Sequence, residues 1–301
     1  MKKFLSVLMA GAMLFGVLTL AGCGDTTEPA AEEGTTTEDT TTTAEFTTVT
    51  EGVLTMSTNA AFPPYEMTDD SGNIVGIDAE IAAAIAEKLG LELQIDDMDF
   101  DGALAAPQSG KSDIVMAGVT VNEERQLVLD FSNTYANGVQ KVIVAEGSYI
   151  TMENLGEQQI GTQKGTTGNI LTTDEFGEDH VIAYDDAIAA VQALNNGQID
   201  CVVIDSAVAD NLVEANPGLT TLDTDYANED YAIGVAKGNT ALLDAINTAL
   251  QELIDDGTVQ SIIDKYIPTD GTAADEAGTT DEAGATDEAG ATDGAEADTA
   301  A

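Results

Sequence analysis

Arg125 is the only arginine among the 301 residues of the chain. Its planar guanidinium presents N–H donors in a fixed fork that binds a carboxylate through two parallel hydrogen bonds, which a lysine ammonium does not do. An exposed ion pair would also explain a single arginine in so acidic a chain. The arginine follows Gly118 and Thr120 at the end of a predicted strand. This position favours the carboxylate-binding interpretation.

Other predicted strands also end in residues suited to binding. Asn59 and Phe62 follow the first strand, Phe100 follows the second, and Asp205 follows a later one. Residues 163–168 form a Gly- and Thr-rich turn that would expose backbone N–H groups at a helix start, as anion sites do. Ligands of open α/β sheets bind beyond the carboxyl ends of the strands. A cation, N–H donors, a carboxylate and aromatic faces at this edge are the complements of a free amino acid.

Three of these residues also have a purely structural interpretation. Asp205 could cap the N-terminus of a helix that follows its strand, a role that does not exclude ligand binding. Phe62 and Phe100 could be ordinary core aromatics, although each follows a polar strand end and neighbours turn residues.

The elements that must position these residues alternate between short β-branched runs and segments of helical periodicity. This is the βαβ pattern of a mainly parallel sheet covered by helices. Apolar residues recur every four positions from Ile77 to Leu89, before Gly90, which predicts an amphipathic helix with a glycine stop. The predicted strands are 53–57, 91–95, 113–117, 142–145, 159–162 and 201–204. The other predicted helices are 103–108, 186–195, 242–253 and 262–267.

The two ends of the chain differ from this core. Residues 1–22 combine an N-terminal positive charge with an apolar run, as a secretory signal does. The run ends in Leu-Ala-Gly-Cys, which resembles a bacterial lipobox. This motif predicts that Cys23 carries diacylglycerol and a further fatty acyl chain such as palmitate. The alternative is an uncleaved membrane helix. Residues 23–48 and 269–301 are acidic and poor in large apolar residues, so we expect a disordered tether and a disordered tail.

Composition excludes several classes of function. The net charge of -46 argues against nucleic acid and anionic lipid headgroups as partners. Export with lipidation of Cys23 leaves Cys201 as the only free cysteine, so we expect no intrachain disulfide. The single histidine, His180, belongs to no metal-binding cluster, and neither a Gly-x-Ser-x-Gly elbow nor a P-loop is present. We therefore expect neither a metal, a cofactor nor an enzymatic activity.

A series of ordered motifs between about residues 50 and 268 resembles the family 3 extracellular solute-binding proteins, the polar amino-acid receptors of ABC importers. The motifs are Asn-Ala-Ala-Phe-Pro-Pro-Tyr-Glu (59–66), Gly-Ile-Asp (76–78), Asp-Phe-Asp-Gly (99–102), Ala-Gly-Val-Thr (117–120), Glu-Arg (124–125), Gln-Lys-Gly-Thr-Thr (163–167) and Gly-Thr (257–258). The resemblance implies a two-lobed α/β fold of the type II periplasmic-binding-protein kind. Residues 49–138 and 232–268 would form the first lobe, residues 139–231 the second, and crossing segments near 135–139 and 229–233 the hinge.

The resemblance also implies roles for the site residues. Arg125 and the Thr167 region would hold the α-carboxylate of the ligand, with Thr120 assisting. Asp205 and the Gly118 carbonyl would hold the α-ammonium. The remaining members would surround the side chain, as two aromatic faces and two positions that vary with the ligand: Phe62, Phe100, Asn59 and Gln163.

The implied partners are a free amino acid and the membrane subunits of an ABC permease with its cytoplasmic ATPase. The receptor would be an extracytoplasmic monomer, anchored to the outer face of the cell membrane by lipid. A sensor without a transport role and a periplasmic dehydratase on the same fold are the alternatives.

The amides of Asn59 and Gln163 favour a neutral polar side chain, glutamine first and arginine or cystine next. Glutamate is disfavoured, because the chain has no second arginine and Lys164 is not at the side-chain-reading position. An arginine ligand would need a counter-charge such as Glu66 or Asp101.

Overall fold

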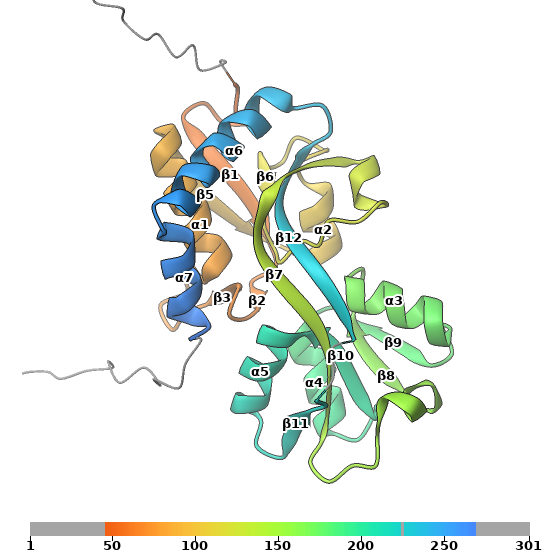
Figure 1. Ribbon diagram of the computed structural model, residues 1–301. Helices are drawn as coiled ribbons and strands as arrows, with labels where there is room; N and C mark the ends of the chain where they lie inside the picture. The colour runs from red at the N-terminus through yellow and green to blue at the C-terminus, as the bar shows by residue number, and fades with distance from the viewer. Residues whose placement is uncertain (1–45, 224–225, 269–301) are drawn as a thin grey trace, which may run out of the picture. The chain divides into compact units, whose positions relative to one another are not determined.

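The computed structural model describes residues 46–223 and 226–268 (Figure 1). The predicted signal, Cys23, nearly all of the predicted tether and the acidic tail lie outside the described residues. No helix of the described part has the length and apolar character that a membrane crossing requires.

The first lobe is built on three parallel strands that are covered by helices. Strand β1 (Val53–Thr58) lies between β5 (Glu92–Asp97) and β6 (Ile114–Val115). The helices of this lobe are α1 (Ile77–Leu89), α2 (Phe100–Ala105), α6 (Thr240–Asp255) and α7 (Thr258–Tyr266). A small antiparallel sheet completes the lobe, with strands β2 (Ala61–Phe62), β3 (Glu66–Thr68) and β4 (Ile74–Val75).

Helix α1 shows why this part of the sequence folds as it does. Ile77, Ile81 and Ile85 are fully buried on one face, as the four-residue repeat predicts. Gly90 adopts the left-handed conformation at φ 70° and ends the helix, with its N–H bonded to carbonyls of the last turn. The predicted helix and its glycine stop are confirmed.

The second lobe repeats the same architecture. Strand β8 (Ile160–Gln163) lies between β10 (Cys201–Asp205) and β9 (Val181–Tyr184), and all three run parallel. The other elements of this lobe are the helices α3 (Thr167–Phe176), α4 (Ala187–Asn195) and α5 (Ser206–Ala215), the 3-10 helix η2 (Met152–Glu157) and the short strand β11 (Leu219–Thr221). Cys201 is buried and unpaired, as expected of a small core hydrophobe.

Two long antiparallel strands connect the lobes. Strand β7 (Leu129–Ala145) and β12 (Ala227–Ala236) lie side by side, and their pairing spans both lobes (Figure 1). At one end β12 pairs with β6, and at the other β7 pairs with β10, so one nine-stranded sheet runs through both lobes. Eight of its strands follow the order β5-β1-β6-β12-β7-β10-β8-β9, and the ninth, β11, pairs with β7 beside this path. The predicted crossing segments fall within these two strands. The boundaries of the lobes stay a prediction.

Several element predictions were wrong or incomplete. Helix α2 begins at Phe100 rather than at 103, because the side chain of Asp99 accepts a hydrogen bond from the Gly102 N–H at 2.9 Å and caps the helix there. Local sequence pattern predicted only the last four residues of β7 as strand, since its polar first part lacks a β-branched run; part of the rest, and part of β12, were expected only as the crossing strands that the family resemblance implies. The small sheet, β9 and β11 were not predicted, and α5 was expected only through the capping interpretation of Asp205.

Candidate functional site

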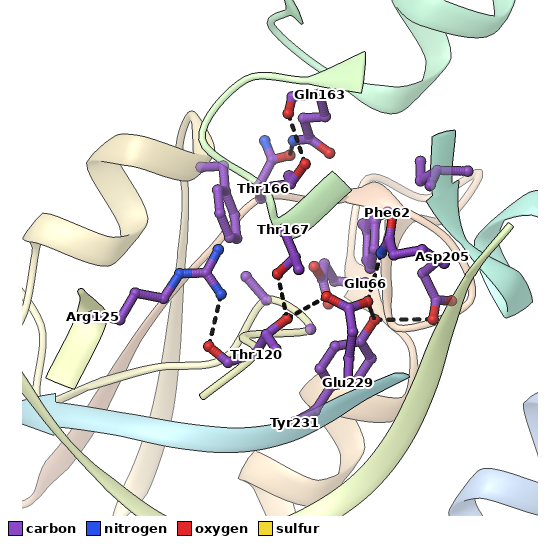
Figure 2. A pocket seen from close by; sticks show the side chains of 16 residues that line it. Phe62, Glu66, Thr120, Arg125, Gln163, Thr166, Thr167, Asp205, Glu229 and Tyr231 are labelled. Carbon is purple, nitrogen blue, oxygen red and sulfur yellow. Dashed lines mark hydrogen bonds between the residues drawn. The ribbon is translucent and has the colours of Figure 1, made fainter. Parts of the chain in front are cut away.

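A pocket lies where the strand ends of the two lobes meet (Figure 2). All nine residues that the sequence nominated for ligand binding line it. The lining also contains seven others: Glu66, Ala117, Gln140, Thr166, Ile204, Glu229 and Tyr231. Asp101 and Lys164 do not line the pocket, and form an ion pair of 2.7 Å with each other. The sequence thus predicted which residues come together, while their roles stay a prediction.

The guanidinium of Arg125 is buried and positioned from both lobes. Arg125 begins the 3-10 helix η1 (Arg125–Leu127), and only 6% of it is exposed. Its Nη1 donates to the carbonyl of Thr120 at 2.8 Å and its Nη2 to the carbonyl of Gly165 at 3.2 Å. The guanidinium carbon lies 5.3 Å from the centroid of the Phe100 ring, a cation–π contact.

These contacts fix the position of the Arg125 guanidinium and leave some of its N–H donors unused. Two of the five N–H groups of the guanidinium have protein acceptors among the described residues, so donors are left for an anion. Burial lowers the pKa of Arg125 from its ordinary value, and the charge of Glu229 opposes this effect. A buried cation with free donors is the arrangement that a carboxylate ligand needs.

The N-terminus of α3 supplies further donors near Arg125. Thr166 caps the helix by accepting a hydrogen bond from Asn169, and both Thr166 and Thr167 line the pocket. The first N–H groups of a helix have no partner within it, and the helix dipole favours negative charge there. The hydroxyl of Thr167 is already committed, since it donates to Thr120 Oγ1 at 2.8 Å. The backbone N–H groups of this turn are therefore the donors that it offers.

The carboxylate of Asp205 faces the pocket from the second lobe. Its Oδ1 accepts from the N–H groups of Ala207 and Val208, at 2.8 and 3.1 Å, so the capping interpretation is confirmed. Its Oδ2 accepts from the Tyr231 hydroxyl at 2.9 Å. Burial, with a contribution from the charge of Glu229, raises the pKa of Asp205 to about 6. The cap uses one oxygen and leaves the other oriented toward the pocket network.

Sequence reasoning missed Glu229 and Tyr231, which lie two residues apart on β12 and so on one face of the strand. Both are buried. Glu229 accepts hydrogen bonds from Thr120 at 2.6 Å, Gln140 at 2.5 Å and Tyr231 at 3.0 Å. The sequence signal that could have identified them is their Glu-x-Tyr spacing, which puts both side chains on one face of the predicted crossing strand.

The aromatic and amide residues line another part of the pocket. Gly118 has φ 53°, and a Cβ at this position would lie 2.8 Å from the Phe62 ring, so glycine is required for this approach. Gln163 Nε2 donates to Asn59 Oδ1 at 2.8 Å, and Asn59 Nδ2 donates to the Met98 carbonyl at 2.8 Å. Gln163 Oε1 is buried and has no donor among the described residues. This end of the pocket therefore offers an unused acceptor.

Glu66 lines the pocket as a fully buried carboxyl group. Neither of its oxygens has a donor among the described residues. Burial raises the pKa of Glu66 well above its ordinary value, and the neighbouring Asp78 adds to this shift. Since Asp78 accepts from the Gly118 N–H at 2.9 Å, it is the better-stabilised anion of the two. This pKa shift disfavours the ionised form of Glu66 and so its use as the counter-charge of a ligand.

A search of residues 46–223 and 226–268 found no group of three or more His, Cys, Asp or Glu side chains that could hold a metal ion. The chemistry that the pocket does offer is recognition: a fixed cation, a fixed anion, helix N–H donors and aromatic faces.

Several known proteins are similar to this chain in sequence or in structure. A probable histidine-binding protein from Neisseria gonorrhoeae is 30% identical over 91% of this chain and 98% of its own length. A putative ABC transporter arginine-binding protein from Escherichia coli K12 is 30% identical over 71% of this chain and 90% of its own. The solved structure of an ancestral arginine-binding protein bound to glutamine is 39% identical, with a TM-score of 0.69 over 72% of this chain and 99% of its own.

The family itself is shown by the sequence. Residues 54–269 match the bacterial extracellular solute-binding proteins, family 3. Proteins of this kind bind solutes outside the cytoplasm and are not enzymes, so the expected absence of catalysis is confirmed by the family and the dehydratase alternative is not supported. The two-lobed type II fold is likewise confirmed by the structural neighbours. The chain belongs to the family 3 extracellular solute-binding proteins, and it is an amino-acid-binding receptor.

Proposed function

We propose that this receptor binds one polar amino acid in the pocket between its lobes and delivers it to an ABC import permease. The observation that carries the proposal is the presence, in one pocket, of the buried cation Arg125 and the buried carboxylate Asp205. A zwitterionic α-amino-acid head group presents an anion and a cation a few bonds apart. Paired charges of this kind bind such a group with charge-assisted hydrogen bonds, about twice as strong as neutral ones.

The free donors and acceptors suggest how the head group binds. The α-carboxylate would take the unused N–H groups of Arg125 and the backbone N–H groups at Thr167. The α-ammonium would take Asp205 and the carbonyl of Gly118, whose N–H is committed to Asp78. Thr120 is an acceptor in this arrangement, because its single hydroxyl proton is donated to Glu229. Its side chain therefore belongs with the ammonium, and only its backbone N–H could assist the carboxylate.

The side chain of the ligand would lie near Phe62 and Phe100 and reach the amide pair. The unpaired Gln163 Oε1 is a buried acceptor, and a buried acceptor without a donor costs free energy, about 1 to 3 kcal/mol. A ligand side chain that donates an N–H relieves this cost. Glutamine does so without bringing a charge to a neutral end of the pocket, and is our first choice. Arginine also donates and stacks well on aromatic rings, so it comes next.

Calorimetric titration of the purified protein with the twenty common amino acids, cystine and ornithine tests this proposal. We expect tightest binding by glutamine, then arginine, and weak binding of glutamate, whose carboxylate would face Gln163 Oε1 and has no second buried cation. Tightest binding of glutamate would contradict the assignment of the side-chain end. Binding of no amino acid would contradict the function.

We further propose that Cys23 carries the lipid that holds the receptor on the outer face of the cell membrane. The support is the Leu-Ala-Gly-Cys sequence at the end of an apolar run. Stable anchoring needs two or more acyl chains, which a diacylglyceryl cysteine provides. Cell fractionation of the wild type and Cys23→Ser tests this: the variant should leave the membrane fraction or stay unprocessed, and unchanged processing and membrane retention would refute the anchor.

A further inference from the structure

Glu229 is a second buried carboxylate in the pocket, beyond the residues that sequence reasoning assigned to the ligand. It is 4% exposed and receives three hydrogen bonds, from Thr120, Gln140 and Tyr231 (Figure 2). Both carboxylate oxygens of Glu229 therefore have donors: Oε1 faces the Thr120 hydroxyl, and Oε2 faces the Gln140 amide and the Tyr231 hydroxyl. Its donors come from Thr120 in the segment after β6 and from the two long strands β7 and β12, so Glu229 connects the binding residues with the strands that join the lobes.

Glu229 determines where the neighbouring hydroxyl groups of Thr120 and Tyr231 direct their protons. A hydroxyl has one proton to donate. The proton of Thr120 goes to Glu229 Oε1, so Thr120 Oγ1 accepts from Thr167 and has a remaining lone pair for another donor. The proton of Tyr231 lies within hydrogen-bonding distance of both Glu229 Oε2, at 3.0 Å, and Asp205 Oδ2, at 2.9 Å. The two carboxylates therefore compete for one donor.

We propose that Glu229 is a positioning residue of the ammonium site, which keeps Thr120 and Asp205 oriented as acceptors and adds a second negative charge beside the ligand's ammonium. The inference rests on the proposed function. A ligand carboxylate compensates the charge of Arg125, which leaves two carboxylates, Asp205 and Glu229, facing one ammonium. This excess of negative charge selects ligands with a free amino group.

The charge of Glu229 also affects the pH at which the site works. The ionisable groups that face Asp205 are Tyr65 and Glu66 from the first lobe, and Glu229 and Tyr231 from β12. Burial is the main cause of the raised Asp205 pKa of about 6; repulsion by Glu229 raises it further and the Tyr231 hydrogen bond lowers it. Below this pH the empty pocket holds a proton on Asp205, and the ligand's ammonium must displace it.

The decisive variant is Glu229→Gln, tested in the full chain by calorimetry with the tightest-binding amino acid between pH 4.5 and 8. Glutamine keeps the shape of the side chain, removes the charge and can return a donor to Thr120. We expect the affinity at pH 7.5 to fall about tenfold or more, equivalent to about 1.4 kcal/mol. We also expect the midpoint of the acid-side loss of affinity to move to lower pH, because a like charge beside Asp205 has been removed.

Asp230→Asn is the matched control. It removes the same charge from the neighbouring position of β12, where Asp230 is exposed and bonded to Asn137 at 2.6 Å. This variant should keep both the affinity and the midpoint of the wild type. A loss of affinity in Glu229→Gln that is equal at every pH, or no loss at all, would overturn the positioning role. Failure of the wild type to bind any amino acid would instead refute the proposed function.

Tyr231→Phe gives an independent measurement if Glu229→Gln does not fold. The variant removes the hydrogen bond that lowers the pKa of Asp205 and leaves the charge of Glu229 in place. The acid midpoint should therefore move to higher pH, opposite to the shift in Glu229→Gln. A midpoint at or below that of the wild type would count against the coupling of these three groups.

Discussion

The two ends of the pocket are built in different ways. The head-group end contains Arg125, Asp205 and Glu229, which are buried charges held by hydrogen bonds from both lobes and from the long strands. The side-chain end contains the neutral amides of Asn59 and Gln163, with one acceptor unused. In the proposed function, the charges fixed at one end would select α-amino acids as a class. The neutral groups at the other end, with their unused hydrogen-bond acceptor, would let single substitutions change which amino acid is preferred.

The largest effect should come from breaking the head-group end at its cation. Arg125→Ala should abolish detectable binding, because removing one partner of a buried charge pair costs about 2 to 5 kcal/mol, thirtyfold or more in affinity. Calorimetry measures the loss, and thermal unfolding checks that the fold survives. Lys111→Ala is the control, since it removes an exposed positive charge outside the pocket. Affinity in Arg125→Ala equal to that of the control would refute the carboxylate site.

Asp205→Asn separates ligand binding from helix capping at the same residue. Asparagine caps helices about as well as aspartate, so the melting temperature should stay close to that of the wild type. The affinity should fall at least tenfold at pH 7.5, because the ammonium loses its charged acceptor, on the order of 1.5 to 3 kcal/mol. A variant that melts earlier and binds normally would assign Asp205 to the helix alone.

The pH dependence of the wild type should report the same carboxylate. Because the pKa of Asp205 is raised to about 6 in the empty pocket, affinity should be constant above this pH and fall about tenfold per pH unit below it. Stability changes in the opposite sense: the folded pKa is above the unfolded one, so this group costs stability as pH rises from about 4 to 6. Calorimetry of Asp205→Asn, which should lose the acid dependence of binding, identifies the group.

A substitution at the neutral end should change the relative affinity for different amino acids more than the affinity for all of them. Gln163→Glu replaces the unused amide acceptor with a carboxylate, and it should increase the affinity for arginine relative to glutamine several-fold, by about 1 kcal/mol. Titration of both ligands gives the ratio. Gln159→Glu, which precedes the start of β8 and lies outside the pocket, adds the same charge as a control. An unchanged ratio would place the ligand side chain away from Gln163.

The same contrast explains how much of the site the sequence could predict. Arg125, Asp205 and Phe100 follow predicted strands, and the convergence of parallel strand ends makes such positions recognisable without a structure. Glu229 and Tyr231 lie inside a long antiparallel strand, where no turn or strand end marks them. Their place in the pocket depends on the pairing of β12 with β7, a contact between segments about ninety residues apart that local patterns do not contain.

The fold was predictable to a similar extent and for similar reasons. Buried strands and the four-residue repeat of α1 are local signals, and they were recovered. The polar first part of β7 forms a strand because β12 pairs with it, and the small sheet forms because its three short segments pair with one another. Such elements are set by tertiary context, which overrides local propensity.

The smallest effect concerns an ion pair between the lobes at the margin of the site. Lys164 in the second lobe pairs with Asp101 in the first at 2.7 Å, and their side chains are 63% and 45% exposed. An exposed pair contributes about 0.2 to 1 kcal/mol, so Lys164→Gln should weaken ligand binding less than about fivefold, through faster dissociation, and only at low salt. Lys88→Gln is the control, because Lys88 pairs with Glu252 at 3.0 Å within the first lobe and should leave binding unchanged. The two ion pairs differ mainly in whether they join the lobes. A salt-dependent change in the dissociation rate of the ligand that occurs only in Lys164→Gln would therefore show that contact between the lobes retains the ligand, and not surface charge in general. Equal behaviour of the two variants would show that this contact between the lobes does not retain the ligand.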